Sequence, residues 1–407
     1  MTNNLAVRIM LLDDEPFMLK LIGRVLEALG FTAVSPYASG AAALAALDAP
    51  SGHPELILLD LNMPEMDGIE FVRHLVERNY AGSVVLISGE DERMLQAANK
   101  LVQAHKIKIL GHLQKPLAPE ALGVLLAQWT PPAPGQSREA KAAYGANAVR
   151  TAIANGELVN YYQPKVAMAD GRVVGVETLV RWRHPTDGMV FPDQFIDVAE
   201  RHGLIDDLTR VVLSDALAQT RVWRDAGLEL RVAVNLSMDN LVTLNFADYV
   251  VAAAVEAGLA PAEIVLEVTE SRLIADLRIP LEILTRLRLK RFRLSIDDFG
   301  TGHSSLAQLR DMPFDELKID RSFVHGAHSA PTLRAIVKAN LNLARQLGME
   351  VVGEGVEDRD DWDFLRLMGC DLTQGYFIAQ PMPAAELPGW IETWEVRLRD
   401  DGLVRGQ

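Results

Sequence analysis

Nine polar side chains beyond residue 170 stand at the ends of short apolar runs, where a strand is expected to end. A barrel strand is normally an uninterrupted run of Val, Ile and Leu, so a series of polar endings is unusual. Because the carboxyl ends of barrel strands meet in one mouth, we expect these side chains to converge there. Any one alone could be a solvated strand end or a helix cap. The set comprises Glu177, Asn235, Glu267, Asp297, Asp298, Lys318, Asp320, Glu354 and Gln374.

The chemistry of this set is that of a hard-oxygen metal site. Carboxylates and an amide favour Mg²⁺ or Mn²⁺ over zinc, and no His or Cys stands at metal-ligand spacing. The adjacent Asp297 and Asp298 are consistent with two metal ions, an arrangement that supports phosphoester cleavage. Lys318 is a general base if its pKa is depressed, an orienting group for a metal-bound hydroxide, or a structural ion pair. Arg181 suits either a substrate phosphate or a surface salt bridge.

Strand ends in the first part of the chain carry a second acidic set. The stretch "MLLDDE" places Asp13 and Asp14 after the first strand, and "LILLDLNMPEMDG" places Asp60 after the third. Functional groups gather beyond the carboxyl ends of an open parallel sheet, where three carboxylates would hold Mg²⁺. Asp60 could then be a nucleophile towards a phosphoryl group, assisted by Lys115 and Ser88. Each acid taken alone is better explained as a solvated strand-end cap.

The elements that must position these residues alternate between strand and helix patterns. Five apolar runs and five helical patterns before residue 130 predict a flavodoxin-like, doubly wound parallel sheet. The stretch "TPPAPGQS" then breaks the pattern, and about eight strand-helix units follow, which is the rhythm of a TIM (β/α)8 barrel. A hairpin signal at Asp170-Gly171 predicts one antiparallel strand in a modified barrel. We expect a first domain over 5–129, a linker over 130–144 and a barrel over 145–398.

Composition and charge exclude several classes of protein. The chain has 407 residues, a formal net charge of -15 and a pI near 5.1, which argues against a DNA-coating surface or a polybasic membrane anchor. No apolar run approaches the roughly 20 residues needed to span a bilayer, and the N-terminus shows no secretory leader. The single cysteine, Cys370, fits a reducing compartment. We therefore expect a cytoplasmic protein that binds neither DNA nor membrane directly.

Residues 5 to about 129 resemble the receiver domain of two-component response regulators. The stretches "LLDDE", "DLNMPEMDG", "LIS" and "LQKP" match the acidic pair, phospho-acceptor loop, hydroxyl and lysine of that family. The resemblance implies one Mg²⁺ at the acidic pair and phosphorylation of Asp60 by a cognate histidine kinase. His112 stands where the family usually has a Tyr or Phe that repositions on phosphorylation, so the chain departs from the family at this switch position.

Residues 145 to about 395 resemble an EAL domain, the cyclic di-GMP phosphodiesterase fold. The matching stretches include "YYQPKV", "GVETLVRWRHP", "VNLS", "LEVTES", "IDDFGTGHSSL", "LKIDRSFV", "VGEGVED" and "QGYFIAQPMP". The resemblance implies hydrolysis of cyclic di-GMP to linear 5′-pGpG, with Glu177, Lys318 and Glu354 as the catalytic group. It also implies two metal ions, one bound by Glu177, Asn235, Glu267 and Asp297 and the second by Asp298 and Asp320. Glu354 and Gln374 are implied to hold metal or water, and Glu270 to anchor the loop after Asp298. The implied substrate contacts are Leu179, Arg181, Gln374 and Pro381.

The chain departs from the EAL pattern at two positions and leaves one alternative function open. Thr178 stands where Ala is usual, and His303 stands where Tyr is commonest, but neither change removes a metal ligand. The alternative is a catalytically weak EAL domain that binds the dinucleotide or a protein partner. Such modules typically lose an acid, the lysine or the loop glutamate, and all of these are present here. The family commonly dimerises, so the resemblance implies a homodimer or higher homo-oligomer.

Overall fold

The computed structural model describes residues 7–49, 53–78, 80–89, 94–95, 98–99, 102, 107–127, 129, 144–269, 278–300 and 306–403. The chain forms two compact units, Met1–Ala142 and Ala143–Gln407, and each is described by itself. Glu270, His303 and nearly all of the expected linker lie outside the described residues.

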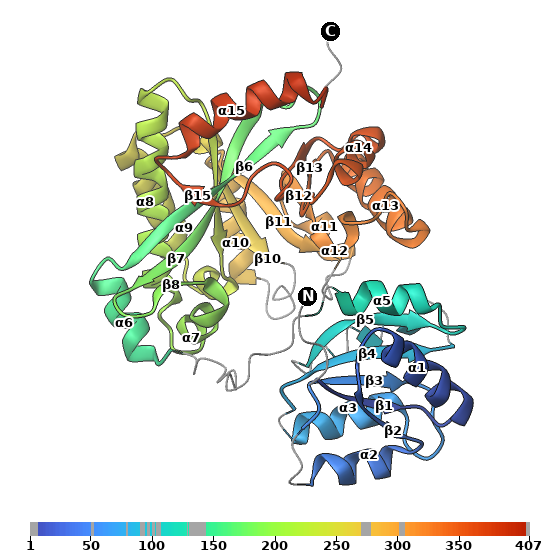
Figure 1. Ribbon diagram of the computed structural model, residues 1–407. Helices are drawn as coiled ribbons and strands as arrows, with labels where there is room; N and C mark the ends of the chain where they lie inside the picture. Colours follow the sequence, from blue (N-terminus) through green and yellow to red (C-terminus); the bar gives the residue numbers. More distant parts are fainter. Residues whose placement is uncertain are drawn as a thin grey trace. The chain divides into compact units, whose positions relative to one another are not determined.

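The first unit is a parallel five-stranded sheet with the order β2-β1-β3-β4-β5 (Figure 1). This order is typical of a doubly wound fold and confirms the predicted architecture. Along β1, Ile9 and Leu11 pack towards α1 and α5, whereas Met10 and Leu12 pack towards α2 and α3. The elements are β1 (Arg8–Leu12), α1 (Pro16–Ala28), β2 (Ala33–Tyr37), α2 (Gly40–Leu47), β3 (Leu56–Asp60), α3 (Gly68–Glu77), β4 (Ser83–Ser88), β5 (Lys108–Gln114) and α5 (Pro119–Ala127).

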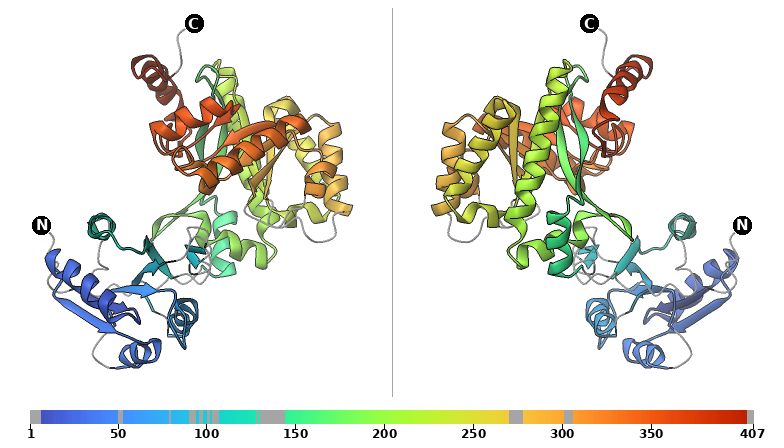
Figure 2. Two further views of the ribbon diagram at one scale, coloured as in Figure 1. Left: turned by 90° about the vertical axis from the view of Figure 1, so that its right-hand side faces the viewer. Right: turned by 90° about the vertical axis from the view of Figure 1, so that its left-hand side faces the viewer.

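The second unit is an eight-stranded barrel closed by the pairing of β6 with β7. The ring runs β6-β14-β13-β12-β11-β10-β9-β7, and helices cover its outside (Figures 1 and 2). Its strands are β6 (Leu158–Ala167), β7 (Val173–His184), β9 (Arg231–Leu236), β10 (Ile264–Thr269), β11 (Arg293–Phe299), β12 (Glu316–Ile319), β13 (Glu350–Gly353) and β14 (Leu372–Thr373). Its α-helices are α6 (Ala146–Ala154), α7 (Ile196–Arg201), α8 (Ile205–Asp225), α9 (Asn245–Ala257), α10 (Arg278–Leu289), α11 (Leu306–Asp311), α12 (Arg321–Val324), α13 (Pro331–Leu347), α14 (Arg359–Met368) and α15 (Leu387–Asp400).

One strand of the ring is antiparallel, as the hairpin signal predicts. β6 pairs antiparallel with both β7 and β14, while the other neighbours in the ring are parallel. The turn between β6 and β7 uses Gly171 at a φ of 73°, a left-handed conformation that glycine adopts at little cost. Two short strands that the sequence did not predict, β8 (Gly188–Val190) and β15 (Met382–Pro383), extend the sheet. Among the described helices, none combines the length and the apolar character that crossing a bilayer requires.

Candidate active site

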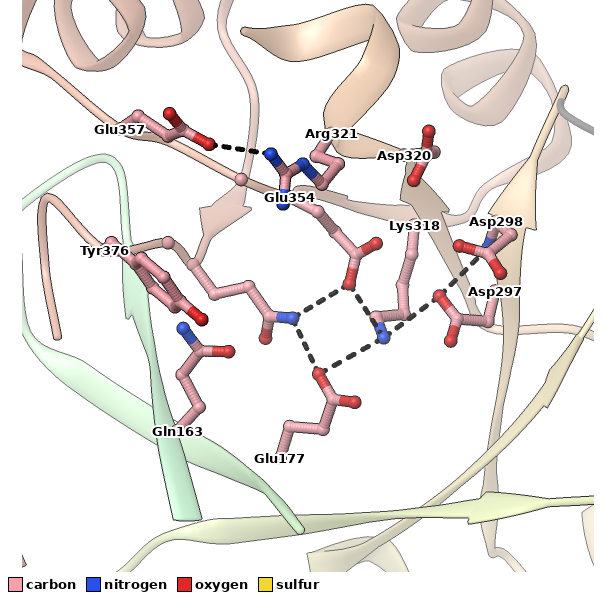
Figure 3. Close-up of a pocket in the computed structure, with 13 residues that line it drawn as sticks. Gln163, Glu177, Asp297, Asp298, Lys318, Asp320, Arg321, Glu354, Glu357 and Tyr376 are labelled. Carbon is pink, nitrogen blue, oxygen red and sulfur yellow. Dashed lines mark hydrogen bonds and ion pairs between the residues drawn. The ribbon is translucent and has the colours of Figure 1, made fainter. Parts of the chain in front are cut away.

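A cavity of about 300 Å³ lies at the carboxyl ends of the barrel strands (Figure 3). The residues predicted for the site that line this cavity come from β7, β11, β12 and the segments after β12, β13 and β14. The structure therefore brings together side chains from the two ends of the unit, because a closed barrel places the carboxyl ends of its parallel strands on one rim. The polar side chains that line the cavity are Gln163, Glu177, Asp297, Asp298, Lys318, Asp320, Arg321, Glu354, Glu357, Gln374 and Tyr376.

Lys318 is the centre of this site. Its side chain is 1% exposed. Four carboxylates surround its Nζ atom, two of them from neighbouring strands. The distances are 3.0 Å to Asp297 Oδ1, 2.8 Å to Glu354 Oε1, 3.3 Å to Glu177 Oε2 and 2.9 Å to Glu267 Oε2.

The charges of this cluster set its protonation states. Burial opposes the charge on Lys318, but the carboxylates of Asp297 and Glu177 raise its pKa well above the ordinary value. Burial likewise opposes ionisation of Glu177, yet the ammonium of Lys318 lowers its pKa to about 2. Burial raises the pKa of Glu354 well above its ordinary value. An ammonium that holds its proton this firmly donates hydrogen bonds, so these charges argue against the general-base alternative for Lys318.

Glu267 lies deeper than the cavity and is fully buried between two lysines. Its Oε1 is 2.5 Å from Lys165 Nζ, and its Oε2 contacts Lys318. Lys165 in turn lies 3.2 Å from Glu316 Oε1. Burial raises the pKa of Glu267 to about 7 in spite of both ammonium groups. The interior of the barrel therefore contains a column of alternating charges that ends at Lys318.

A local irregularity lets two adjacent aspartates face the same cavity. In a regular strand Asp297 and Asp298 would point to opposite faces. The pairing of β11 with β12 shifts register between Ile296 and Phe299, and Asp298 has a φ of 55°. Aspartate tolerates this left-handed conformation better than most residues. The Asp298 amide also donates to Asp297 Oδ1 at 2.9 Å, which fixes the pair.

The donor set fits a divalent cation. One oxygen each of Asp297, Asp298 and Glu354 lie within 4.8 Å of one another. Four carboxylates share one ammonium at Lys318, which leaves an excess of negative charge. Gln374 Nε2 donates to Glu177 and Glu354 at 2.6 and 2.8 Å, while its buried Oε1 has no hydrogen-bond partner in the described part of the chain. An unpartnered oxygen beside surplus carboxylates is the chemistry that Mg²⁺ or Mn²⁺ requires.

The remaining predicted residues of the barrel lie around this core. Asn235 Nδ2 donates to Glu177 Oε1 at 3.0 Å, so Asn235 touches the site without lining the cavity. Arg181 packs 5.1 Å from the ring centroid of Phe191. Leu179, Arg181 and Pro381 are not among the described residues that line the cavity. Thr178, Leu179 and Asn235 line a different, apolar pocket that does not include Glu177.

Sequence reasoning missed several residues of the site. Lys165 lies inside β6 and Glu316 is the first residue of β12, so the search for polar residues at the carboxyl ends of strands passed over both. Their signal was a charged residue within an apolar run, as in "YYQPKV" and "FDELKID". Gln163 and Tyr376, which line the cavity, carried no comparable signal.

The first unit brings its predicted acids together. Asp13, Asp14 and Asp60 each offer an oxygen within 4.8 Å of the others, which suits one metal ion. Lys115 Nζ lies 3.0 Å from Asp13 Oδ2 and 2.9 Å from Asp60 Oδ2. Burial raises the pKa of Asp60 although Lys115 opposes this shift. The Lys115 amide donates to the carbonyl of Ser88 at 2.8 Å, so the lysine and the serine are neighbours across the sheet edge.

His112 lies in β5, at the position where receiver domains usually have a Tyr or Phe that repositions on phosphorylation. Its Nδ1 atom is 2.7 Å from Asn99 Nδ2, and the side chain is half-buried. The described contact is therefore polar, unlike the packing of a phenylalanine at this position.

We predict that Asp298 makes metal binding at the barrel site depend on pH. Burial, reinforced by Asp297, raises the pKa of Asp298 to about 6. Below that pH the carboxyl holds a proton that a cation must displace, so binding tightens by up to about tenfold per pH unit as pH rises towards 6. We expect titration calorimetry with Mn²⁺, in an Asp13→Asn background that disables the first-unit site, to show this slope. Asp298→Asn should reduce this slope and the exposed Asp311→Asn should not. An unchanged slope in Asp298→Asn would contradict the prediction.

Comparison with known proteins places both units in families. The EAL domain model matches residues 146–381, and the response regulator receiver domain model matches residues 9–127. The cyclic di-GMP phosphodiesterase RocR of Pseudomonas aeruginosa is 34% identical over 380 residues, which covers 93% of this chain and 96% of RocR. The cyclic di-GMP phosphodiesterase NbdA of the same organism is 44% identical over 247 residues, covering 60% of this chain and 32% of NbdA. A solved structure of the MucR phosphodiesterase in complex with c-di-GMP is 41% identical, with a TM-score of 0.57, and covers 59% of this chain and 98% of that one.

The chain belongs to the EAL domain family and joins that domain to a response regulator receiver domain. The similarity to RocR covers 93% of the chain and so extends over both units.

Proposed function

We propose that this chain is a signal-responsive phosphodiesterase that hydrolyses cyclic di-GMP to linear 5′-pGpG. The observation that carries the proposal is the convergence of Glu177, Asp297 and Glu354 on the buried ammonium of Lys318 at the mouth of the barrel. Surplus negative charge at a rim of this kind suits divalent cations and a phosphodiester substrate. The names of RocR and NbdA support the choice of cyclic di-GMP.

Two divalent cations, Mg²⁺ or Mn²⁺, belong to this proposal. Glu177, Asn235, Glu267 and Asp297 would hold one ion, and Asp298 with Asp320 would hold the other. Bound cations would supply Lewis acidity and a water of lowered pKa. The left-handed backbone at Asp298 keeps both aspartates directed to the same side, which a two-ion site requires.

Lys318, Glu354 and Gln374 would position the attacking water and stabilise charge. Lys318 holds its proton, so it acts as a donor towards oxygen rather than as a base. Burial raises the pKa of Glu354, so this carboxyl group takes up a proton more readily than an exposed glutamate does. Gln374 spans Glu177 and Glu354 through its amide nitrogen and keeps the two carboxylates in register.

Substrate contacts would come from the rim. Leu179, Arg181, Gln374 and Pro381 are the proposed substrate-binding residues, with Arg181 suited to a phosphate. Glu270, which lies outside the described residues, would anchor the loop that follows Asp298.

The receiver domain would supply control. We assign phosphorylation to Asp60, with Asp13 and Asp14 holding Mg²⁺ and with Lys115 and Ser88 sensing the phosphoryl group. A cognate histidine kinase would donate it, and the barrel would act as a homodimer or higher homo-oligomer. The close contacts of Lys115 with Asp13 and Asp60 support this assignment.

The direct test is an assay of the purified chain with cyclic di-GMP and Mg²⁺ or Mn²⁺, with product separation by chromatography. Linear pGpG is expected, and none should form when EDTA replaces the metal. If no pGpG appears above a Glu177→Ala control but cyclic di-GMP still binds, the chain is instead a dinucleotide-binding effector.

Asp60→Asn should abolish the response to a phosphoryl donor. Treatment of the parent protein with acetyl phosphate and Mg²⁺ is expected to add one phosphoryl group and to change the rate of pGpG formation. A carboxamide is a poor nucleophile compared with a carboxylate, so neither change should occur in the variant. Intact-protein mass spectrometry and the rate assay measure both effects. Asp67→Asn, a change of the same type that retains the cap of α3, should respond like the parent. A parent-like response of Asp60→Asn would overturn the assignment.

A further inference from the structure

A second group of potential metal ligands lies outside the catalytic cavity. His325 and His328 lie in the turn after α12, in the segment that follows β12. Asp358 and Asp361 lie at the start of α14, in the segment that follows β13. The helices α12 and α14 are drawn in orange to red in Figure 1. Neither histidine lines the catalytic cavity, so the proposed hydrolysis does not use them.

The buried carboxylate of Asp361 holds this group together. Its Oδ1 accepts from the Gly326 amide at 2.9 Å, and its Oδ2 accepts from the Glu357 amide at 3.2 Å. Asp361 is fully buried, and the two amides hold its carboxylate in one orientation. Fixed orientation of a carboxylate by backbone donors is typical of the surroundings of metal sites.

Both imidazoles face this carboxylate. His325 Nδ1 lies 2.8 Å from Asp361 Oδ2, and His328 Nδ1 lies 3.6 Å from Asp361 Oδ1. The His328 Nδ1 atom is buried and makes no hydrogen bond to any described residue. A lone imidazole–carboxylate ion pair would account for His325, but it leaves the buried nitrogen of His328 unexplained.

The spacing of the donor atoms fits a metal ion. One donor atom each of His325, Asp358 and Asp361 lie within 4.8 Å of one another. Donors of a tetrahedral zinc site, at about 2.0–2.2 Å from the metal, are separated from each other by roughly 3.3–3.5 Å. The distance from His328 Nδ1 to Asp361 Oδ1, 3.6 Å, is close to that separation. The distance from His325 Nδ1 to the other oxygen, Oδ2, is 2.8 Å, a hydrogen bond that a bound ion would lengthen. Asp358 Oδ1 already caps the Asp361 amide at 2.9 Å, so the second oxygen of Asp358 is the one available to a metal.

The type of donor differs from that of the catalytic cavity. Two imidazoles and two carboxylates favour a borderline ion such as Zn²⁺ or Co²⁺, whereas the cavity offers oxygen donors that favour Mg²⁺. We propose that His325, His328, Asp358 and Asp361 bind one transition-metal ion of the zinc or cobalt type, separate from the catalytic ions. Bound there, the ion joins the segment after β12, which carries Asp320, to the segment after β13, which carries Glu354.

The experiment uses the full, tag-free chain in excess Mg²⁺, without cyclic di-GMP, titrated with Co²⁺ and followed by visible absorption. The parent should bind one more equivalent of Co²⁺ than the His325→Ala/His328→Ala variant. Co²⁺ that replaces Mg²⁺ at the other sites remains in both proteins and cancels in the difference. His202→Ala, which removes an exposed histidine after α7, should behave as the parent does. Equal uptake by the parent and the double variant would overturn the proposal.

A second measurement guards against misfolding of the double variant. In excess Mg²⁺, Zn²⁺ should raise the midpoint of thermal unfolding of the parent and of His202→Ala by more than that of the double variant, because a ligand bound to the native state stabilises it. If the double variant does not fold, His328→Gln replaces it and should weaken Co²⁺ binding by at least about tenfold. Unchanged affinity in His328→Gln would refute the site. Because the readout is metal binding, failure here leaves the hydrolase assay unaffected, and failure of that assay leaves this result standing.

Discussion

Glu177→Gln is expected to lower kcat/KM for cyclic di-GMP by about 100-fold or more, because charge stabilisation by a bound metal is worth several kcal/mol. The substitution keeps the size of the side chain but removes the negative charge that faces Lys318 and the proposed cation. Asn235 and Gln374 both donate hydrogen bonds to the Glu177 carboxylate. The amide nitrogen of the substituted glutamine cannot accept one of these hydrogen bonds. Initial rates of pGpG formation at several Mg²⁺ concentrations measure the effect, and part of the loss should be recovered at high Mg²⁺.

The matched control is Glu350→Gln. Glu350 is also an ion-paired glutamate, held by Arg231 and Arg293, but it lies at the first residue of β13, away from the mouth. This variant should keep kcat/KM within about twofold of the parent, since surface ion pairs contribute little. If Glu177→Gln retained more than about a tenth of the parent activity at saturating Mg²⁺, its proposed role as a metal ligand would be wrong.

Lys318→Met is expected to destabilise the metal-free barrel by about 3–5 kcal/mol, the cost of removing one partner from a buried ion pair. Methionine fills a similar volume but leaves four carboxylates without their shared ammonium. A divalent cation can supply the missing charge, so Mg²⁺ or Mn²⁺ should stabilise the variant more than the parent. At a concentration about 100 times its Kd, bound ligand contributes about 2.7 kcal/mol. Activity should remain low at any metal concentration, because the proton donor is absent.

Urea unfolding followed by tryptophan fluorescence measures this effect. Of the six tryptophans, only Trp129 lies in the first unit, so the signal reports mainly on the barrel. The comparison is made with EDTA and with Mg²⁺. Lys338→Met, at an exposed position of α13, controls for loss of a lysine and should change the free energy of unfolding by less than about 0.5 kcal/mol. Equal destabilisation of Lys318→Met with and without metal would argue that the site holds no cation.

Much of the fold follows from local patterns in the sequence. The apolar runs "LILLD" and "SVVLIS" are buried along their whole length as β3 and β4, because helices cover both faces of a parallel sheet. The Asp170-Gly171 signal predicted the antiparallel β6. The strands β8 and β15 escaped prediction because they contain three and two residues, too few for an alternating pattern to be recognised.

The site residues that could be predicted are charged residues in otherwise apolar strands. Glu177, Asp297 and Lys318 stand out because a buried strand has no structural need for them, and the structure places all three at one cavity. The register shift at Asp298 was not predictable, since it depends on pairing between β11 and β12 rather than on either sequence alone. The grouping of His325 and His328 with Asp361 was likewise not predictable from spacing, because the donors come from two different strand-helix units.

The charged column inside the barrel constrains how this protein can change by mutation. Glu316, Lys165, Glu267 and Lys318 form a chain in which each interior charge has a partner on either side. Losing one member leaves each buried neighbour without one of its partners, whereas replacing an adjacent pair by apolar residues can be close to neutral. The effects of substitutions along the column are therefore strongly non-additive, and a route from Lys165 and Glu316 to an apolar pair passes through an intermediate less stable than either end. Divergence at these positions is accordingly expected to be concerted.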